Sequence, residues 1–203
     1  MKVIFRFLFS LVFLTVPHIT FSQAPENEIT PEEHIQQLHL GTLLVRLKTK
    51  QNAILLLEAR GMKEDADLIW QEQRKKNEEI VKAFTFIFDF CPVYFFYDEN
   101  SGLVKDGQYE GVLMNANFDT LDLDTLHDFN HVYFADIGEV YFEAFSQHMK
   151  GAVILDSAMN LLPRRFPSIV RKRAGLALIE RTNTTMIEEM NEMLHKFYDR
   201  VTH

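Results

Sequence analysis

Cysteine is almost absent from this chain: Cys91 is the single one among 203 residues. One cysteine excludes an internal disulfide, and a chain without a CxxC motif lacks the paired thiols that dithiol redox chemistry needs. The stability of the fold must therefore come from packing. The 18 phenylalanines supply a large apolar area for it.

Positive charge is also scarce. The chain has 21 Lys and Arg against 29 Asp and Glu, which gives a formal net charge of −8. Nucleic acids and anionic lipids are bound chiefly through clustered Lys and Arg. The sequence therefore predicts no nucleic-acid partner, and we also expect no cofactor.

The N-terminal apolar run, Phe7 to Val16, is about half the length of roughly 20 residues that crosses a bilayer. Lys2 and Arg6 precede it, and small residues follow it at the positions that a signal peptidase reads. This pattern predicts a secretory signal peptide over residues 1–22, cleaved near Ser22. We expect an exported protein, periplasmic or secreted, with no membrane span in the mature chain.

The mature chain is expected to consist of a leader and one domain. Residues 23–33, QAPENEITPEE, are polar with two prolines, which is typical of a flexible leader. Residues 34–203 have a length that fits a single globular domain with a continuous core.

Short apolar segments alternate with helical patterns, which predicts an α/β fold with a mixed, partly parallel sheet flanked by helices. In TLLVRLKT, residues 42–49, a period of two places Arg46 and Lys48 on the solvent side, although a helix running on from His34 is the alternative. PVYFFY, residues 92–97, is apolar at every position and predicts a central strand covered on both faces. Further strands are predicted at HVYFADI (131–137), AVILD (152–156) and SIVRKR (168–173).

A helical hairpin is predicted over about residues 50–89, with its turn at Gly61. Lys63 to Phe88 contains no Gly or Pro and has apolar residues at helical spacing. Its middle, Gln71 to Glu79, is wholly polar, so we expect the hairpin to project from the body at its tip. That polar run is either a solvated helix face or a docking surface for another protein.

Residues 131–156 predict a β-α-β unit whose helix is EVYFEAFSQHMK and whose strands are parallel. The C-terminal segment predicts an amphipathic helix that packs on the sheet and opens with a capping box at Thr185 and Glu188. The last two predicted strands and this helix resemble the second half of the thioredoxin-like fold. A thioredoxin-like topology is therefore the alternative to a mixed sheet of unspecified strand order.

The segment FTFIFDFCP resembles the active-site region of peroxiredoxins in its Cys91-Pro92 pair. That family has a threonine or serine three residues before the cysteine and a proline four before that, where this chain has Phe88 and Phe84. A reactive thiolate also needs positive charge or a helix start nearby, and here Asp89 precedes the thiol. The sequence favours a buried, inert thiol, with thiol-dependent redox chemistry as the alternative.

His127 and His131 are four residues apart, as in a metal-binding helix, and several aspartates lie close by in sequence. A zinc protease has HExxH, whereas Asp128 stands at the position of the glutamate. The aspartates do not match a calcium-binding loop. The sequence favours a solvated acidic loop over a specific metal site.

The segment RRFPSIVRKR, residues 164–173, gathers cations in an acidic chain. Converging guanidinium groups of Arg164, Arg165, Arg171 and Arg173 would bind a carboxylate or phosphate. Alternatively, positive side chains protect an edge strand from pairing with other chains.

We therefore expect no catalytic residue and a binding or protein-interaction module. Its two rival contact surfaces are the hairpin tip and the cationic strand Arg164 to Arg173, and its partner is a protein or a small anionic ligand. The alternative is a thiol-dependent redox enzyme, or a thioredoxin-like protein, that uses Cys91.

Overall fold

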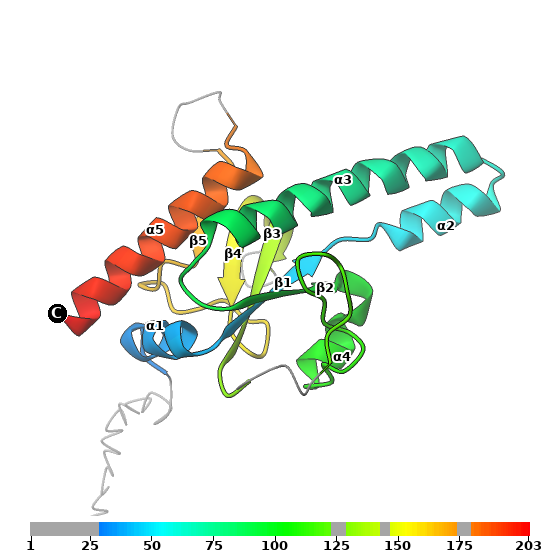
Figure 1. Cartoon of the computed structure of the whole chain (residues 1–203). Helices are drawn as coiled ribbons and strands as arrows, with labels where there is room; N and C mark the ends of the chain where they lie inside the picture. The colour runs from blue at the N-terminus through cyan, green and yellow to red at the C-terminus, as the bar shows by residue number, and fades with distance from the viewer. Residues whose placement is uncertain (1–28, 123–128, 143–146, 174–179) are drawn as a thin grey trace, which may run out of the picture.

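The structure is a computed structural model that describes residues 29–122, 129–142, 147–173 and 180–203. The strands are β1 (Thr42–Leu47), β2 (Val93–Tyr97), β3 (Val132–Phe142), β4 (Gln147–Leu155) and β5 (Ile169–Arg171). The helices are α1 (Pro31–Leu40), α2 (Gln51–Ala59), α3 (Lys63–Ile87), the 3-10 helix η1 (Asp98–Asn100), α4 (Ser101–Lys105) and α5 (Asn183–Thr202). The strands form one sheet in the order β2-β1-β3-β4-β5 (Figure 1). The predicted α/β fold with a mixed, partly parallel sheet is confirmed.

Strand β1 forms the centre of the parallel half of the sheet. It pairs in parallel with β2 and with β3, so that Val45 lies between Phe95 and Ala135. Val45 is fully buried in the core on one face of the sheet, and Leu44 is fully buried in the core on the other. TLLVRLKT is therefore a strand and not the continuation of a helix.

The sheet is the middle layer of the molecule. Helices α1, α3 and α5 cover one face (Figure 1), where Ile35, Phe84 and Met190 join one core. The opposite face is covered by η1, α4 and the chain that follows them, where Val104 and Leu113 belong to a second core. A strand between two apolar layers is expected to be apolar on both sides.

The β-α-β unit predicted over residues 131–156 is wrong. The residues of the expected helix instead prolong β3 to Phe142 and begin β4 at Gln147, and these two strands are antiparallel. The Val, Tyr and Phe of this segment favour an extended chain over a helix. Gly138 lies opposite Gly151 in the ladder, and a Cβ at Gly151 would clash with the Val170 carbonyl oxygen of β5.

The last three elements follow in the predicted order: β5 is antiparallel to β4, and α5 packs on the sheet. The amphipathic stripe of α5 is confirmed, since Met186, Met190 and Leu194 are fully buried. The predicted capping box is misplaced by one turn. Thr182 is the N-cap, and its hydroxyl oxygen accepts a hydrogen bond from the Thr185 backbone N–H at 3.1 Å.

Strand β2 lies at an edge of the sheet, so its prediction as a central strand is wrong. Its free side is partly closed by an isolated bridge, in which the backbones of Phe95 and Met114 exchange two hydrogen bonds of 3.0 and 2.8 Å. This bridge explains why an edge strand carries apolar residues throughout. The loop protects it from pairing with another chain.

The predicted projecting hairpin is confirmed as α2 and α3 (Figure 1). Gly61 makes the turn with a φ of 78°, in the left-handed region that favours glycine. Helix α2 has no buried residue and leaves Leu55 and Leu56 each 52% exposed. Only the C-terminal part of α3 reaches the core of the domain.

Helix α1 includes the last three residues of the predicted leader, 31–33. Pro31 is its first residue, and Thr30 and Glu33 form a capping box in which the Glu33 backbone N–H donates to the Thr30 hydroxyl at 3.2 Å. The predicted signal peptide lies outside the described residues. Among the described helices, none has the length and apolar character needed to cross a membrane.

Candidate functional site

The carboxyl ends of the parallel strands β1 and β2 meet the base of the helical hairpin. Lys48, Thr49 and Lys50 join β1 to α2, and Asp98 follows β2. The Asp98 carboxylate accepts hydrogen bonds from the Thr49 backbone N–H at 2.9 Å and from its hydroxyl at 2.8 Å. In open α/β sheets, ligands bind outside the carboxyl ends of the strands. This edge is therefore the first place to look for a site.

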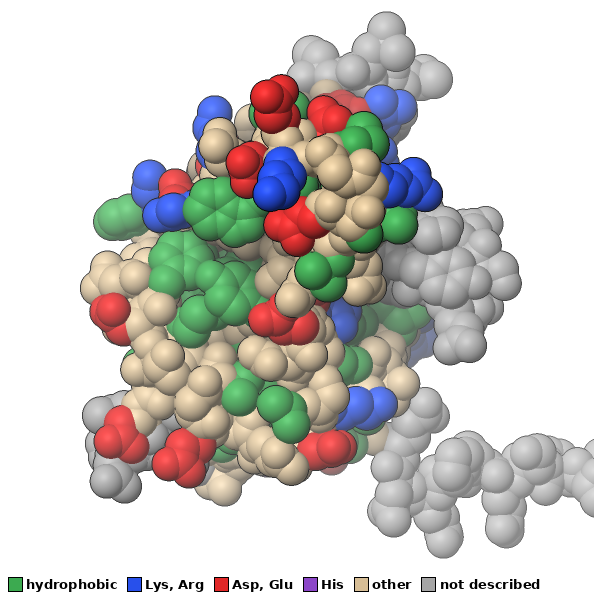
Figure 2. All heavy atoms as spheres, turned by 90° about the vertical axis from the view of Figure 1, so that its right-hand side faces the viewer, with side chains coloured by type: hydrophobic (Ala, Val, Ile, Leu, Met, Phe, Trp, Pro, Cys, Tyr) green, Lys and Arg blue, Asp and Glu red, His purple; other side chains and the backbone are tan. Residues whose placement is uncertain are grey.

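A cleft of about 660 Å³ lies here between the hairpin and the ends of β1 and β2, and we name it the hairpin cleft. Its apolar lining is Ile54, Leu55, Trp70, Tyr97 and Phe118, and its amide side chains are Gln51, Gln73, Asn77 and Asn117. Figure 2 faces the hairpin end of the molecule and shows hydrophobic side chains gathered there between charged ones. A mainly apolar cleft of this size with a few polar groups is typical of small-molecule sites.

Trp70 is the single tryptophan of the chain and is half exposed at the cleft. The Arg74 guanidinium carbon lies 5.5 Å from the centre of its ring, and Arg74 also donates to the Glu78 carboxylate at 3.1 Å. These two contacts hold the cation beside the ring face. An aromatic ring that is fixed on one side and open on the other offers a stacking surface.

Two amides are buried at the cleft within the predicted polar run of α3. The Gln73 side-chain N–H donates to Asn77 at 3.0 Å, and the Asn77 side-chain N–H donates to the Lys48 carbonyl at 2.8 Å. This chain of bonds ties α3 to the segment that leaves β1. The run from Gln71 to Glu79 therefore contacts the body of the protein through these two amides.

Phe118 enters the cleft from a strained turn. Its φ is 65°, which is a rare conformation for a bulky residue. The Asn115 side-chain oxygen holds the turn, because it accepts from the backbone N–H groups of Asn117 at 2.8 Å and Asp119 at 3.0 Å. Strained residues tend to occur at functional sites, where the surrounding structure compensates for their cost.

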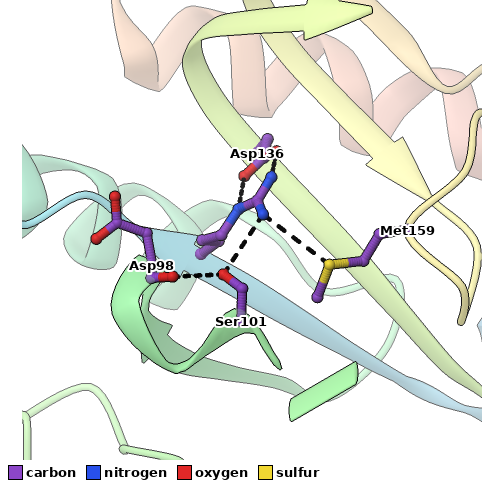
Figure 3. Close-up of polar contacts among 5 residues, drawn as sticks. Asp98, Ser101, Asp136 and Met159 are labelled. Atoms are coloured by element: carbon purple, nitrogen blue, oxygen red, sulfur yellow. Dashed lines mark hydrogen bonds and ion pairs between the residues drawn. The ribbon is translucent and has the colours of Figure 1, made fainter. Parts of the chain in front are cut away.

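Arg46 belongs to β1, and its side chain contacts three other parts of the chain, at Asp136, Ser101 and Met159, which Figure 3 labels. Its Nε donates to Asp136 of β3 at 2.6 Å and its Nη2 donates to the other oxygen of the same carboxylate. Its Nη1 points to Ser101 of α4 at 3.5 Å and to the Met159 sulfur at 3.9 Å. The side chains of Arg46 and Asp136 are 22% and 2% exposed. The prediction that Arg46 faces solvent is therefore wrong.

Burial acts to lower the pKa of Arg46, but the hydrogen bonds and charge of Asp136, with a smaller effect of Asp98, raise it. The guanidinium therefore stays charged and is neutralised inside the protein. This pair positions β1 against β3 rather than offering a free cation to a ligand.

The four arginines predicted to form an anion site occupy separate places. Arg164 and Arg165 are exposed in the chain before β5, and Arg165 lines a hollow with Arg200 and Glu32 to which the other three do not contribute. Arg173 is paired with Glu180 at 2.6 Å.

Arg171 is exposed at the end of β5, which is an edge strand. Its backbone carbonyl accepts a hydrogen bond from Arg181 at 2.8 Å. This arrangement favours the edge-protection alternative over a common anion clamp at the four positions.

Cys91 is 7% exposed, next to the core formed by α3 and β1. Burial raises the pKa of its thiol to about 12, and a hydrogen bond with the Leu43 backbone opposes this only weakly. Near pH 7 the group is therefore a thiol and not the thiolate that acts as a nucleophile.

We expect Cys91 in the native protein to react with a thiol reagent such as DTNB at pH 7 more than about 100-fold more slowly than in denaturant. The reagent reaches Cys91 only when the surrounding structure opens locally. An opening that costs about 2.8 kcal/mol already slows the reaction about 100-fold. The unfolded protein, treated with the same reagent, is the control. Rapid native labelling together with peroxide consumption that is lost in Cys91→Ser would support the redox alternative instead.

Of the predicted histidine pair, His131 is described by the structure, whereas His127 and two of its neighbouring aspartates lie outside the described residues. Within the described part of the chain, no three His, Cys, Asp or Glu side chains are grouped so that they could hold a metal ion.

Sequence reasoning missed the residues that form the hairpin cleft, and one signal was available for the pair beneath it. Arg46 within residues 43–47 and Asp136 within residues 132–137 are each the single charge of a short apolar stretch, and they have opposite signs. Trp70 and Phe118 carried no such signal, because 48 positions separate them in the chain. Comparison of the chain with protein-family models, with curated proteins and with solved structures gave no match.

Proposed function

We propose that the protein is a binding module without catalytic activity and that a small organic ligand occupies the hairpin cleft. The observation that carries this proposal is the joint position of Trp70 and Phe118, two aromatic side chains from different elements that line one cleft at the carboxyl edge of the parallel strands. The ligand expected there has an apolar, ring-sized body. The amide groups of Gln51 and Asn117, which also line the cleft, supply hydrogen-bonding partners beside it.

The residues that line the cleft favour binding over catalysis. Its charged members are lysine, arginine and glutamate, and the described lining contains no cysteine, histidine or serine that a nucleophilic mechanism would use. The buried thiol of Cys91 does not line the cleft either. A thiol-dependent activity is therefore the weaker of the two functions.

The proposed place of action is the periplasm or the exterior of the cell. Lys2 and Arg6, the short apolar run and the small residues before Gln23 support this part of the proposal. Mass measurement of the protein recovered from fractionated cells tests it. A cytoplasmic product that retains Met1 would contradict it.

The hairpin cleft can be tested with the dye 8-anilinonaphthalene-1-sulfonate, whose apolar rings fluoresce when they leave water. We expect saturable binding to the native protein with energy transfer from Trp70, the single tryptophan. Trp70→Ala should weaken the affinity, read from dye emission, by about tenfold, because a buried aromatic contact contributes about 1.4 kcal/mol. Phe118→Asn should have a similar effect, and asparagine tolerates the left-handed backbone at this position.

Phe86→Ala is the matched control for these two variants. Phe86 is 83% exposed on α3, as an aromatic residue of the same helix that does not line the cleft. Its loss should leave the affinity unchanged. If dye binding weakens in Phe86→Ala and persists in both cleft variants, the hairpin cleft is not the site.

A further inference from the structure

A second hollow, of about 460 Å³, lies on the other side of Lys48, between the base of the hairpin and the N-terminus of α5. Its lining contains five cationic side chains and two carboxylates, those of Glu79 and Glu139. We name it the basic hollow. The cations are Lys48, Lys50, Lys76, Lys172 and Arg181. In a chain with a net charge of −8, this local excess of positive charge is unusual.

Three of the five cations already have carboxylate partners. Lys172 pairs with Glu180 at 3.0 Å, and Arg181 pairs with Glu189 at 2.9 Å. Lys76 has a longer, exposed contact of 3.9 Å with a glutamate of its own helix. These pairs fix the two cations next to α5 but also neutralise much of their charge.

Lys48 and Lys50 differ from these three. Within the described part of the chain, neither ammonium group has a carboxylate within 4.0 Å that would form an ion pair. Lys48 is half-buried and Lys50 is exposed, and the carboxylates of the hollow, Glu79 and Glu139, offset part of their charge without an ion pair to either lysine. Two ammonium groups separated by a single residue repel each other, and an anion between them would relieve that repulsion.

The backbone of Lys50 has an unusual conformation at the same place. Its φ of 59° and ψ of 20° lie in the left-handed region, and it precedes α2 without a side-chain capping bond. Asparagine and aspartate adopt this conformation because their short side chains bond the local backbone, which lysine does not do.

The N-terminus of α5 adds to the positive potential of the hollow. Thr182 and Asn183 both line it, and α5 is a helix of 20 residues whose N-terminal end carries partial positive charge. The side chain of Thr182 bonds the Thr185 backbone N–H, so the helix end contributes mainly through its dipole.

We propose that the basic hollow binds a small oxyanion, a phosphate or carboxylate group held between Lys48, Lys50 and the N-terminal end of α5. This goes beyond the function proposed for the hairpin cleft, because the hollow is separate and its chemistry is ionic. The two sites share Lys48 alone among their cations, whereas Trp70 and Phe118 take no part in the basic hollow. An experiment can therefore refute one of the two proposed binding sites and leave the other standing.

Isothermal titration calorimetry of the native protein with inorganic phosphate and with citrate, at matched chloride concentration, tests the basic hollow. We expect saturable binding of at least one of the two, which weakens as salt rises from about 0.05 to 0.5 M because exposed charges become screened. Lys50→Asn should weaken it about fivefold, and Lys48→Gln by a similar factor. Asparagine removes the charge at position 50 while it keeps the left-handed backbone.

Lys82→Gln is the control, since Lys82 is an exposed lysine of α3 that does not line the hollow. The affinity for the anion should not change in this variant. Absence of binding for both anions would overturn the proposal, and so would an equal loss in Lys82→Gln and Lys50→Asn, which would show a general effect of net charge. Thermal unfolding of each variant without ligand identifies any loss that comes from a damaged fold.

Discussion

Replacement of Arg46 by leucine is expected to lower the free energy of unfolding by about 3–5 kcal/mol, because it leaves the Asp136 carboxylate buried without its partner. The geometry supports the upper part of this range, since both carboxylate oxygens accept from the guanidinium and the Asp136 side chain is 2% exposed. Urea unfolding followed by circular dichroism measures the change.

The double variant Arg46→Leu/Asp136→Leu is expected to recover most of the lost stability. Two apolar side chains of suitable volume often replace a buried ion pair at little cost. Arg173→Leu is the matched control, because Arg173 forms an exposed pair with Glu180 and its loss should cost no more than about 1 kcal/mol. A loss of the same size in both single variants, or no recovery in the double variant, would contradict a buried, structurally important pair.

The Arg46 pair also bears on the two proposed sites, because Lys48 is two residues beyond it on the same chain segment. If the pair fixes how β1 leaves the sheet, the leucine variant should weaken dye and anion binding together. Trp70→Ala, Phe118→Asn and Lys50→Asn should instead affect one ligand each, since each of these residues lines one of the two sites alone. This difference separates a positioning role of Arg46 from direct contact with a ligand.

The elements of the fold could be predicted where the local pattern and the tertiary environment agree. TLLVRLKT, HVYFADI and the C-terminal stripe that includes Met190 were predicted as a strand, a strand and a helix, and the structure confirms all three. EVYFEAFSQHMK was misassigned because Phe142, Phe145 and Met149 satisfy helical spacing, while the preference of the aromatic and β-branched residues for an extended chain decides the structure.

The candidate site was not predictable from local patterns, because it forms from segments that are far apart in sequence. Lys48 follows β1, Trp70 belongs to α3 and Phe118 lies in the loop beyond α4, and only the fold brings them to one edge of the sheet. The cationic run that includes Arg164 and Arg173 is the opposite case, because its residues are close together in the sequence. Its residues belong to an exposed stretch before β5 and to β5 and its end, with the buried Phe166 between them in sequence, so closeness in sequence is not enough to form one site.

The aromatic run around Cys91 was predicted to form part of the hydrophobic core and not a reactive site. In the structure, some of its aromatic side chains are buried and others are exposed. Phe84 is 1% exposed and its ring centre lies 5.5 Å from that of Phe88 and 6.5 Å from that of Phe95. Phe86, two residues further along the same helix, points to solvent. A helix places residues two apart on different faces, so the two phenylalanines differ in burial for a geometric reason.

Phe84→Ala is therefore expected to lower the free energy of unfolding by about 3–5 kcal/mol, because it removes a buried ring and leaves a cavity between α3 and β2. Phe86→Ala should change it by less than about 0.5 kcal/mol, as is usual for an exposed position. The two variants have the same chemistry on the same helix, so helix propensity cancels in the comparison. Since Phe84 fixes the base of the hairpin on the sheet, its loss should also weaken dye binding in the hairpin cleft at urea concentrations below the unfolding transition. Equal stability losses in the two variants would show that α3 does not pack on the sheet through the face described here.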